Sequence, residues 1–298
     1  MIGSVTLDSA EALLVDGGVR HSLVQTDRVA VHVAEAGSGE PVILLHGWPQ
    51  HWWEWRHVIP PLAEHYRVIC PDLRGFGWSA APRDGYEKEG LAADLIALLD
   101  ALRLERVRIA GHDWGGFVAF LAALCAPQRF SHLLALGVIH PWLDPGALSP
   151  IGIAAVLGYQ GPLITPLVGT AVQRHGPFIS WLMRISREGD WEPEVLAAYS
   201  DRLRVPARAR ASVALYRTFV ARELRPLLAG RYRDRRLEIP SRLIVGKRDP
   251  VIGRGLEGFE RFAPRMSLER LPEVGHWLPE EVPDLVADAA LELFSRTA

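Results

Sequence analysis

Cysteine and long apolar runs are scarce in this sequence. The only two cysteines among the 298 residues, Cys70 and Cys125, lie in apolar segments and lack metal-ligand spacing. This argues against a disulfide framework or a redox site, and we expect two buried thiols. No window reaches the ~18 apolar residues of a membrane span, and the N-terminus lacks a basic region followed by a long apolar run. We therefore expect a cytoplasmic protein that makes no use of a membrane.

An excess of charge of either sign is also missing. The chain has 33 basic and 35 acidic residues, a formal net charge of −2 and a pI near 6.6. Such a balance provides no field that would attract nucleic acid or an anionic membrane, and it favours a neutral substrate. Lysine is nearly absent, because Lys88 and Lys247 are the only lysines and the other basic residues are arginines. We draw no function from that bias.

The sequence does contain a repeated alternation of strand and helix patterns. The predicted strands span residues 18–26, 28–36, 41–45, 67–70, 107–110, 132–139, 241–246 and 266–271. The predicted helices span residues 52–65, 91–102 and 282–294, and a further one follows the turn at residues 111–115 and runs through Leu124. The first two strands read as an antiparallel pair, whereas several later ones are continuous apolar runs, as in strands buried on both faces. We predict an α/β fold with a mostly parallel central sheet flanked by helices.

The alternation is interrupted between residues 141 and 228. This stretch reads as helical segments separated by glycine and proline, and it is far longer than an ordinary loop. We predict a core domain formed by residues 1–140 and 229–298, and a helical cap formed by residues 141–228. No repeats or low-complexity tracts interrupt either part.

One stretch organises the core: a strand, a tight turn and a helix meet at Gly111-His-Asp-Trp-Gly115. The spacing is that of G-x-S-x-G, the nucleophile elbow, in which a strained turn presents the central side chain at the edge of the sheet. Here the central residue is Asp113 rather than serine. A carboxylate at this position can displace a leaving group from saturated carbon and become an ester of the enzyme. An aspartate that merely caps the following helix is the alternative.

Two further polar residues follow predicted strands later in the chain. Asp249 comes after residues 241–246, and His276 comes after residues 266–271. The order nucleophile, acid, histidine is the one used by α/β-hydrolases. We predict that Asp113, Asp249 and His276 form a catalytic triad, although Arg-Asp-Pro at Asp249 is also ordinary turn chemistry.

The segment His46-Gly47-Trp48-Pro49 follows another buried strand and ends at the same edge of the sheet. In the hydrolase fold the oxyanion hole uses a backbone N–H of the residue after the nucleophile and one from this loop. We therefore predict Trp114 and Trp48 as the two donors, and both as substrate-binding residues. His46 could brace the loop and receives no chemical role.

The motifs together resemble one family. They are His46-Gly-Trp-Pro-Gln-His-Trp-Trp-Glu-Trp-Arg56, Asp72-Leu-Arg-Gly-Phe-Gly-Trp-Ser79, Gly111-His-Asp-Trp-Gly-Gly116, Gly246-Lys-Arg-Asp249 and Gly275-His-Trp277. Over nearly its whole length the sequence is similar to α/β-hydrolases of the epoxide hydrolase and haloalkane dehalogenase group, and more similar to the epoxide hydrolases. The resemblance implies that the helical insertion covers the site and carries two tyrosines that hydrogen-bond the epoxide oxygen.

Tyr216, in Leu215-Tyr216-Arg217, fits the second of these tyrosines. Tyr159, in Gly158-Tyr159-Gln160, is the candidate for the first, and Tyr199 stands in a weaker context. Either tyrosine could instead be an amphipathic packing residue. The implied reaction needs no metal and no organic cofactor. Asp113 attacks a ring carbon while the tyrosines protonate the departing oxygen, and His276, oriented by Asp249, then activates water that hydrolyses the ester to a vicinal diol.

Two other readings use the same scaffold. A haloalkane dehalogenase would hold a halide between ring N–H groups, such as that of Trp114 with one from Trp142, Trp181 or Trp191. Trp48, however, replaces the asparagine common in those enzymes. A fluoroacetate dehalogenase would fit His140 and Trp142 but places arginine where this chain has Trp114.

A non-catalytic ligand-binding protein is the third reading, and a complete triad argues against it. For the enzyme we expect a small neutral apolar substrate, such as an aryl or alkyl epoxide. The sequence is compatible with a homodimer.

Overall fold

A single sheet carries the strand ends on which the predicted site depends. The computed structural model describes residues 18–143, 158, 160–165, 167–250, 252 and 256–297. Within these ranges eight strands form the order β1-β2-β4-β3-β5-β6-β7-β8. β2 runs antiparallel to both β1 and β4, and every other neighbouring pair is parallel. The α/β fold class predicted above is confirmed.

The strands are β1 Arg20–Gln25, β2 Ala30–Ala36, β3 Pro41–Leu45, β4 Arg67–Pro71, β5 Val107–His112, β6 Phe130–Leu136, β7 Ser241–Gly246 and β8 Met266–Leu271. The helices of the sheet region are η2 Trp52–Trp55, α2 Ile59–Ala63, α3 Lys88–Ala101, α4 Asp113–Cys125, η3 Pro127–Arg129, α11 Leu278–Glu281 and α12 Pro283–Phe294. Between β6 and β7 lie α6 Val168–Arg174, α7 Phe178–Ile185, α8 Pro193–Arg204, α9 Pro206–Thr218, the π-helical turn η5 Phe219–Glu223 and α10 Leu224–Leu228.

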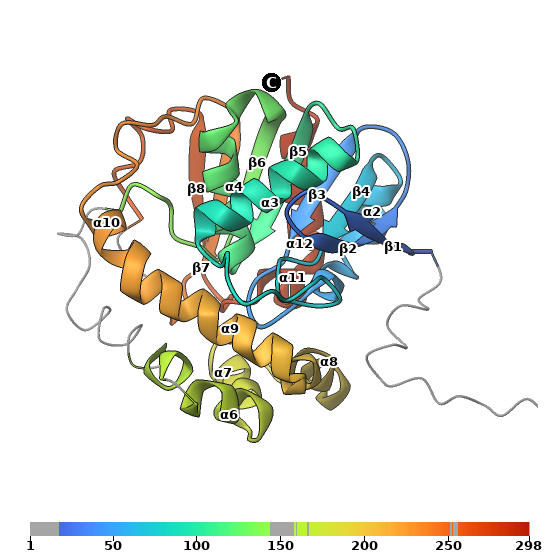
Figure 1. The fold of residues 1–298 in the computed structure, drawn as a ribbon. Helices are drawn as coiled ribbons and strands as arrows, with labels where there is room; N and C mark the ends of the chain where they lie inside the picture. The colour runs from blue at the N-terminus through green and yellow to red at the C-terminus, as the bar shows by residue number, and fades with distance from the viewer. Residues whose placement is uncertain are drawn as a thin grey trace, which may run out of the picture.

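The sheet is buried on both faces because its central strands are apolar at consecutive positions. In β3, Ile43 and Leu45 pack in the cluster that contains the buried faces of α3 and α4. Val42 and Leu44 point the other way, into the cluster with α2 and α12. Figure 1 shows the resulting three layers, with α3 and α4 on one face of the sheet and α12 on the other.

The helices between β6 and β7 gather at one end of this three-layer arrangement. Figure 1 shows α6, α7, α8 and α9 beyond the end of the sheet toward which β6 points, with α9 next to the core. Pro193 and Pro206 stand at the first positions of α8 and α9, where a missing backbone N–H costs no hydrogen bond. The division into a cap of residues 141–228 and a two-part core remains a prediction.

Two local expectations were wrong. Residues 52–65 form not one helix but η2 and α2, because Pro60 and Pro61 in the first turn of α2 lack the N–H groups that would continue the helix from η2. Cys125 is exposed at the end of α4, where Arg235 Nη1 lies 3.3 Å from its Sγ, whereas Cys70 is buried as expected. Both thiols are free. In the part of the chain that is described, no helix has the length and apolar character needed to cross a membrane.

Candidate active site

Asp113 stands on a strained turn between β5 and α4. Its φ angle is +47°, in the left-handed region that non-glycine residues rarely adopt. The flanking glycines are required by close packing. A Cβ on Gly111 would lie 2.5 Å from the Gly115 carbonyl oxygen, and one on Gly115 would lie 2.4 Å from the carbonyl oxygens of Leu45 and His46. The G-x-D-x-G spacing therefore lets β5, the turn and β3 approach closely enough to present the Asp113 side chain.

The two carboxylate oxygens of Asp113 face different partners. Oδ2 accepts a hydrogen bond of 2.9 Å from the backbone N–H of Trp48. Oδ1 lies 3.8 Å from His276 Nε2. The Asp113 side chain keeps 15% of its surface exposed, while the side chains of His276 and Asp249 are almost fully buried. One oxygen is thus held by an amide, and the other is available beside a histidine.

His276 is held by a short contact to Asp249. His276 Nδ1 lies 2.7 Å from Asp249 Oδ2, and Asp249 Oδ1 accepts a hydrogen bond from the backbone N–H of Ile252. Burial lowers the pKa of His276, but the carboxylates of Asp249 and then Asp113 outweigh burial and raise that pKa to about 9. We therefore expect His276 to be protonated at neutral pH, between the carboxylates of Asp113 and Asp249.

Tyr216 lies against both tryptophans of the predicted oxyanion hole. It is buried on α9, and its ring packs edge to face on Trp48, with centroids 5.0 Å apart, and on Trp114, with centroids 5.8 Å apart. Trp48 is fixed to the same helix, because its Nε1–H donates to Ser212 Oγ at 2.6 Å. The structure therefore brings Tyr216, Trp48, Trp114 and Asp113 together.

The other two tyrosines considered from the sequence are Tyr159 and Tyr199. Tyr159 lies outside the described residues. Tyr199, the weaker candidate, is buried on α8 and donates its hydroxyl to Glu280, which also accepts two hydrogen bonds of 2.7 Å from Arg56. Tyr199 thus belongs to a polar cluster that joins α8 to Arg56 and to Glu280 of α11, and its hydroxyl is engaged in that cluster.

Buried polar residues brace the loops around the site, His46 as the sequence suggested and Glu281 without any indication from sequence reasoning. His46 is a loop brace, since its Nε2 accepts from the Leu73 N–H and its Nδ1 donates to the Gly47 carbonyl oxygen. The Glu281 carboxylate accepts from the backbone N–H groups of Gly275 and Trp277 on either side of His276. The backbone N–H of His276 itself donates to the Ser186 carbonyl oxygen in the cap. In the sequence, only the adjacent acidic residues Glu280 and Glu281, shortly after Gly275-His276-Trp277, could have indicated that a carboxylate binds these backbone N–H groups.

Lys88 is a second feature that the sequence did not reveal. Its buried Nζ donates to the Leu215 carbonyl oxygen at 2.8 Å and to Glu223 Oε2 at 2.9 Å, and it lies 4.6 Å from the centre of the Trp114 ring. Burial lowers the pKa of Lys88 to about 8, although Glu223 opposes that shift. These contacts tie α3 of the core to α9 and η5, next to Tyr216.

The tryptophans considered for halide binding are mostly occupied. The indole N–H of Trp142 donates to the carbonyl oxygens of Tyr232 and Arg235, and that of Trp191 donates to Met183. Trp181 is 50% exposed on α7. Of these candidates, Trp114 has a buried indole N–H without a hydrogen-bond partner within the described ranges, as do Trp52 and Trp55 elsewhere in the core. His140, considered with Trp142, has Nε2 3.1 Å from the Leu256 carbonyl oxygen.

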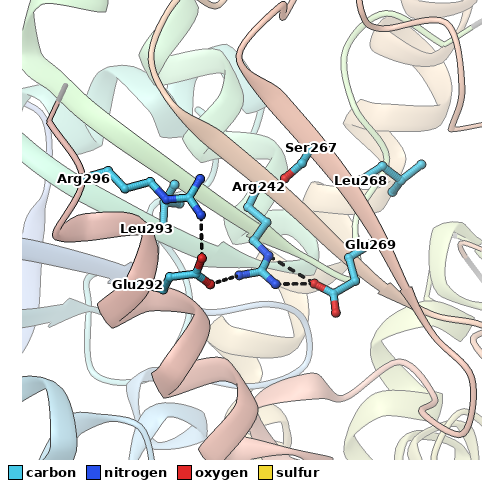
Figure 2. Close-up of a pocket in the computed structure, with 7 residues that line it drawn as sticks. All are labelled: Arg242, Ser267, Leu268, Glu269, Glu292, Leu293 and Arg296. Carbon is cyan, nitrogen blue, oxygen red and sulfur yellow. Dashed lines mark hydrogen bonds and ion pairs between the residues drawn. The ribbon is translucent and has the colours of Figure 1, made fainter.

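A separate cavity of about 380 Å³ lies near the N-terminal ends of β7 and β8, away from the strand ends that carry Asp113 and His276. Figure 2 shows that its charged side chains pair with one another. Arg242 contacts Glu269 and Glu292, and Arg296 contacts Glu292. Because these charges are neutralised in pairs, the cavity offers no unpaired cation for an anionic ligand. Within the described ranges no group of three or more His, Cys, Asp or Glu residues is placed to hold a metal ion.

Comparisons with known proteins show the family of the chain. Residues 40–283 match the model of the α/β hydrolase fold family. The chain is 31% identical to a soluble epoxide hydrolase from Corynebacterium sp. (strain C12) over 93% of this chain and 98% of that protein. Among solved structures, a putative epoxide hydrolase from Pseudomonas aeruginosa is similar with a TM-score of 0.82 at 30% identity, covering 94% of this chain and 96% of that one.

Another similar solved structure carries the name of a different activity. A putative acyltransferase from Salmonella enterica is similar with a TM-score of 0.84 at 28% identity, covering 95% of this chain and 97% of that one. One fold can therefore accompany different named activities. The reaction therefore depends on the nucleophile of this chain and on the residues around it.

Proposed function

The chain belongs to the epoxide hydrolase group of the α/β-hydrolase family, and we propose that it converts an epoxide and water to a vicinal diol through an ester on Asp113. The observation that supports this route is the divided carboxylate. Asp113 Oδ2 is bound by the Trp48 amide, while Oδ1 lies beside His276. One oxygen can then form a bond to carbon while the other remains in an oxyanion hole.

In the first step Oδ1 attacks a ring carbon of the epoxide. The carbon–oxygen bond of the ring breaks, its electron pair moves to the ring oxygen, and that oxygen takes a proton from Tyr216. A phenol suits this role because it ionises near pH ~10 and can donate to an alkoxide as it forms. Tyr159 is proposed as the second donor. The product of this step is a hydroxyalkyl ester of Asp113.

In the second step water hydrolyses that ester. Formation of the ester removes the negative charge of Asp113, which is one of the causes that raise the pKa of His276. His276 can then release its Nε2 proton, which returns to the Tyr216 phenolate left by the first step. The neutral imidazole takes a proton from water as a general base. The hydroxide attacks the Asp113 carbonyl carbon, and the oxyanion forms on Oδ2, where Trp48 and, we propose, Trp114 donate backbone N–H groups. The bond between the carbonyl carbon and Oδ1 breaks, the proton on His276 passes to Oδ1, and the diol leaves with that oxygen. The carboxylic acid left on Asp113 then gives its proton to His276, which restores the resting site.

The substrate proposed for this site is small, neutral and apolar. Trp48, whose backbone N–H binds Asp113, belongs to a group of aromatic rings: Trp48, Tyr216, Trp114 and Phe219 lie in a chain of edge-to-face contacts. Such walls suit an aryl or alkyl epoxide better than a carboxylate or phosphate. A homodimer and a cytoplasmic location remain predictions.

A single turnover in ¹⁸O-labelled water tests the ester route. With excess enzyme, the diol should carry unlabelled oxygen from Asp113, and the label should appear in the peptide that contains Asp113. Label that enters the diol directly in the first turnover would contradict the route, because water would then have attacked the epoxide itself.

Haloalkane dehalogenation is the second candidate, because the buried indole N–H of Trp114 has no partner among the described residues. A halide usually needs two such donors, and the indole N–H groups of Trp142 and Trp191 are bound to carbonyl oxygens. Matched panels of 1,2-epoxyalkanes and 1-haloalkanes separate the two activities. Halide release without diol formation would reverse our assignment.

A further inference from the structure

A buried acid and a buried histidine lie beneath all three loops of the candidate site. We propose that the Glu54–His112 pair positions the loops that carry Trp48, Asp113 and His276, and that hydrolysis of the Asp113 ester depends on this pair more than its formation does. The statement about the two steps rests on the proposed function. The positioning role rests on contacts alone.

The pair touches each loop through a backbone group. Glu54 Oε2 accepts from the backbone N–H of Gly47, the residue before Trp48, at 3.3 Å. The same oxygen lies 3.4 Å from His112 Nδ1, and His112 precedes Asp113 in the chain. His112 Nε2 lies 2.9 Å from the carbonyl oxygen of His276. Both side chains are completely buried, so water does not compete for these contacts.

The contacts fix where protons must be. A carbonyl oxygen only accepts, so His112 Nε2 carries a hydrogen. His112 Nδ1 then either accepts from a protonated Glu54 or, in the imidazolium form, donates to its carboxylate. In both arrangements the pair has no net charge. Burial raises the pKa of Glu54, which agrees with a proton shared within the pair.

Stability alone does not explain a carboxyl group at this place. Glu54 Oε1 is buried without a hydrogen-bond partner within the described ranges, and an unsatisfied buried oxygen destabilises a fold. An apolar side chain would avoid that cost. The compensation is geometric, because one Glu54 oxygen joins the Gly47 loop to the His112 ring, and that ring joins the His276 loop.

The second chemical step uses more of this arrangement than the first. Attack by Asp113 on the epoxide requires that the Asp113 carboxylate face the substrate and that Tyr216 protonate the ring oxygen, but it makes no use of His276. Hydrolysis requires His276 at the correct distance from water and the Trp48 amide on the developing oxyanion at the same time. Displacing the Gly47 and His276 loops should therefore slow hydrolysis selectively.

The test compares Glu54→Gln, Glu54→Met and the control Asp94→Asn by rapid quench and mass spectrometry. Gln keeps the volume of Glu54, but its amide cannot make both contacts through one atom without charging His112. Met makes neither contact. Asp94 is a buried carboxylate whose ion-pair partners are Arg28 and Arg74, so its variant controls for lost stability. We expect hydrolysis to slow about tenfold in Glu54→Gln and more in Glu54→Met. Ester formation should stay within about threefold of the wild type, and Asp94→Asn should keep the wild-type ratio of the two rates.

Equal slowing of both steps, or an unchanged ratio in Glu54→Met, would overturn the step assignment. A second readout is independent of the epoxide reaction: the NMR resonance of the His276 Nδ1 proton that faces Asp249. We expect this resonance to shift or broaden in Glu54→Met and to be unaffected in Asp94→Asn. An unchanged resonance in Glu54→Met would overturn the positioning role. A wild-type protein that forms no ester would instead reject the proposed function, and the resonance would still decide the role of the pair.

Discussion

His276 Nε2 lies 3.8 Å from Asp113 Oδ1, too far for a hydrogen bond but close enough for each charge to affect the other. The histidine is therefore not bound to the nucleophile as it would be to a serine that it must deprotonate. A carboxylate nucleophile, unlike a serine hydroxyl, has no proton for a base to remove. In the proposed mechanism His276 acts only after the ester has formed. Different substitutions should therefore block the two steps separately.

Replacement of His276 by alanine should stop turnover after the first step. Ester formation needs Asp113 and a proton donor, so the variant should accumulate an adduct of enzyme plus epoxide on the peptide that contains Asp113. We expect turnover to fall by at least about 10³-fold. Intact-protein and peptide mass spectrometry measures the adduct, and Asp113→Asn serves as the control that should form none. A reversible complex without an adduct in His276→Ala would favour a binding protein.

Tyr216→Phe should impair ring opening while preserving the aromatic contacts to Trp48 and Trp114. Loss of a general acid typically costs about 10²- to 10⁴-fold, and we expect the lower end if a second tyrosine shares the role. The measurement is the rate of ester formation in a single turnover. Tyr199→Phe is the matched control, because its hydroxyl is bound to Glu280 and should matter to stability rather than to ring opening. Equal rate losses in the two variants would argue against a chemical role for Tyr216.

The protonation of His276 predicts a pH dependence of stability. Its pKa in the folded protein, about 9, is higher than the ordinary value of 6.5 expected when unfolded. The folded state therefore binds the proton more tightly, and this stabilisation is fully present below pH 6.5 and is lost as pH rises through about 9. Lys88 titrates in the opposite sense, because its pKa is lowered to about 8.

The difference between wild type and His276→Gln isolates the histidine contribution from that of Lys88. We expect the urea midpoint of wild type to exceed that of the variant by more at pH 6.5 than at pH 9.5. A difference that is independent of pH would show that His276 is not protonated in the resting site.

Much of the fold could be predicted because most of the strands have a recognisable sequence pattern. β3, β7 and β8 begin and end at the residues expected from the sequence. Apolar runs define β3 and β7, whereas β8, at the edge of the sheet, is only partly apolar. The triad could be proposed because each member follows a strand, and the ends of parallel strands meet at one edge. Helix boundaries were less secure: α3 begins at Lys88 rather than Leu91, because nothing local indicates that a lysine is buried.

The supporting residues of the site could not be predicted, and the reason is physical. Glu54, His112 and Lys88 are ionisable, and such residues are usually assigned to the surface. Their burial depends on partners that lie far along the chain, such as Glu223 for Lys88 and the His276 carbonyl oxygen for His112. No periodicity records a pairing over such a distance.

Lys88 gives a last prediction, which concerns the joint between core and cap. Lys88→Met would leave Glu223 and the Leu215 carbonyl oxygen without the donor that Nζ supplies. Breaking a buried ion pair from one side typically costs about 3 to 5 kcal/mol, and we expect about 3 kcal/mol here because Glu223 is partly exposed. Urea denaturation measures the loss. The double variant Lys88→Met/Glu223→Leu should recover part of it, because no carboxylate is then stranded. A double variant that is less stable than Lys88→Met would mean that Glu223 stabilises the joint through contacts other than the one to Lys88.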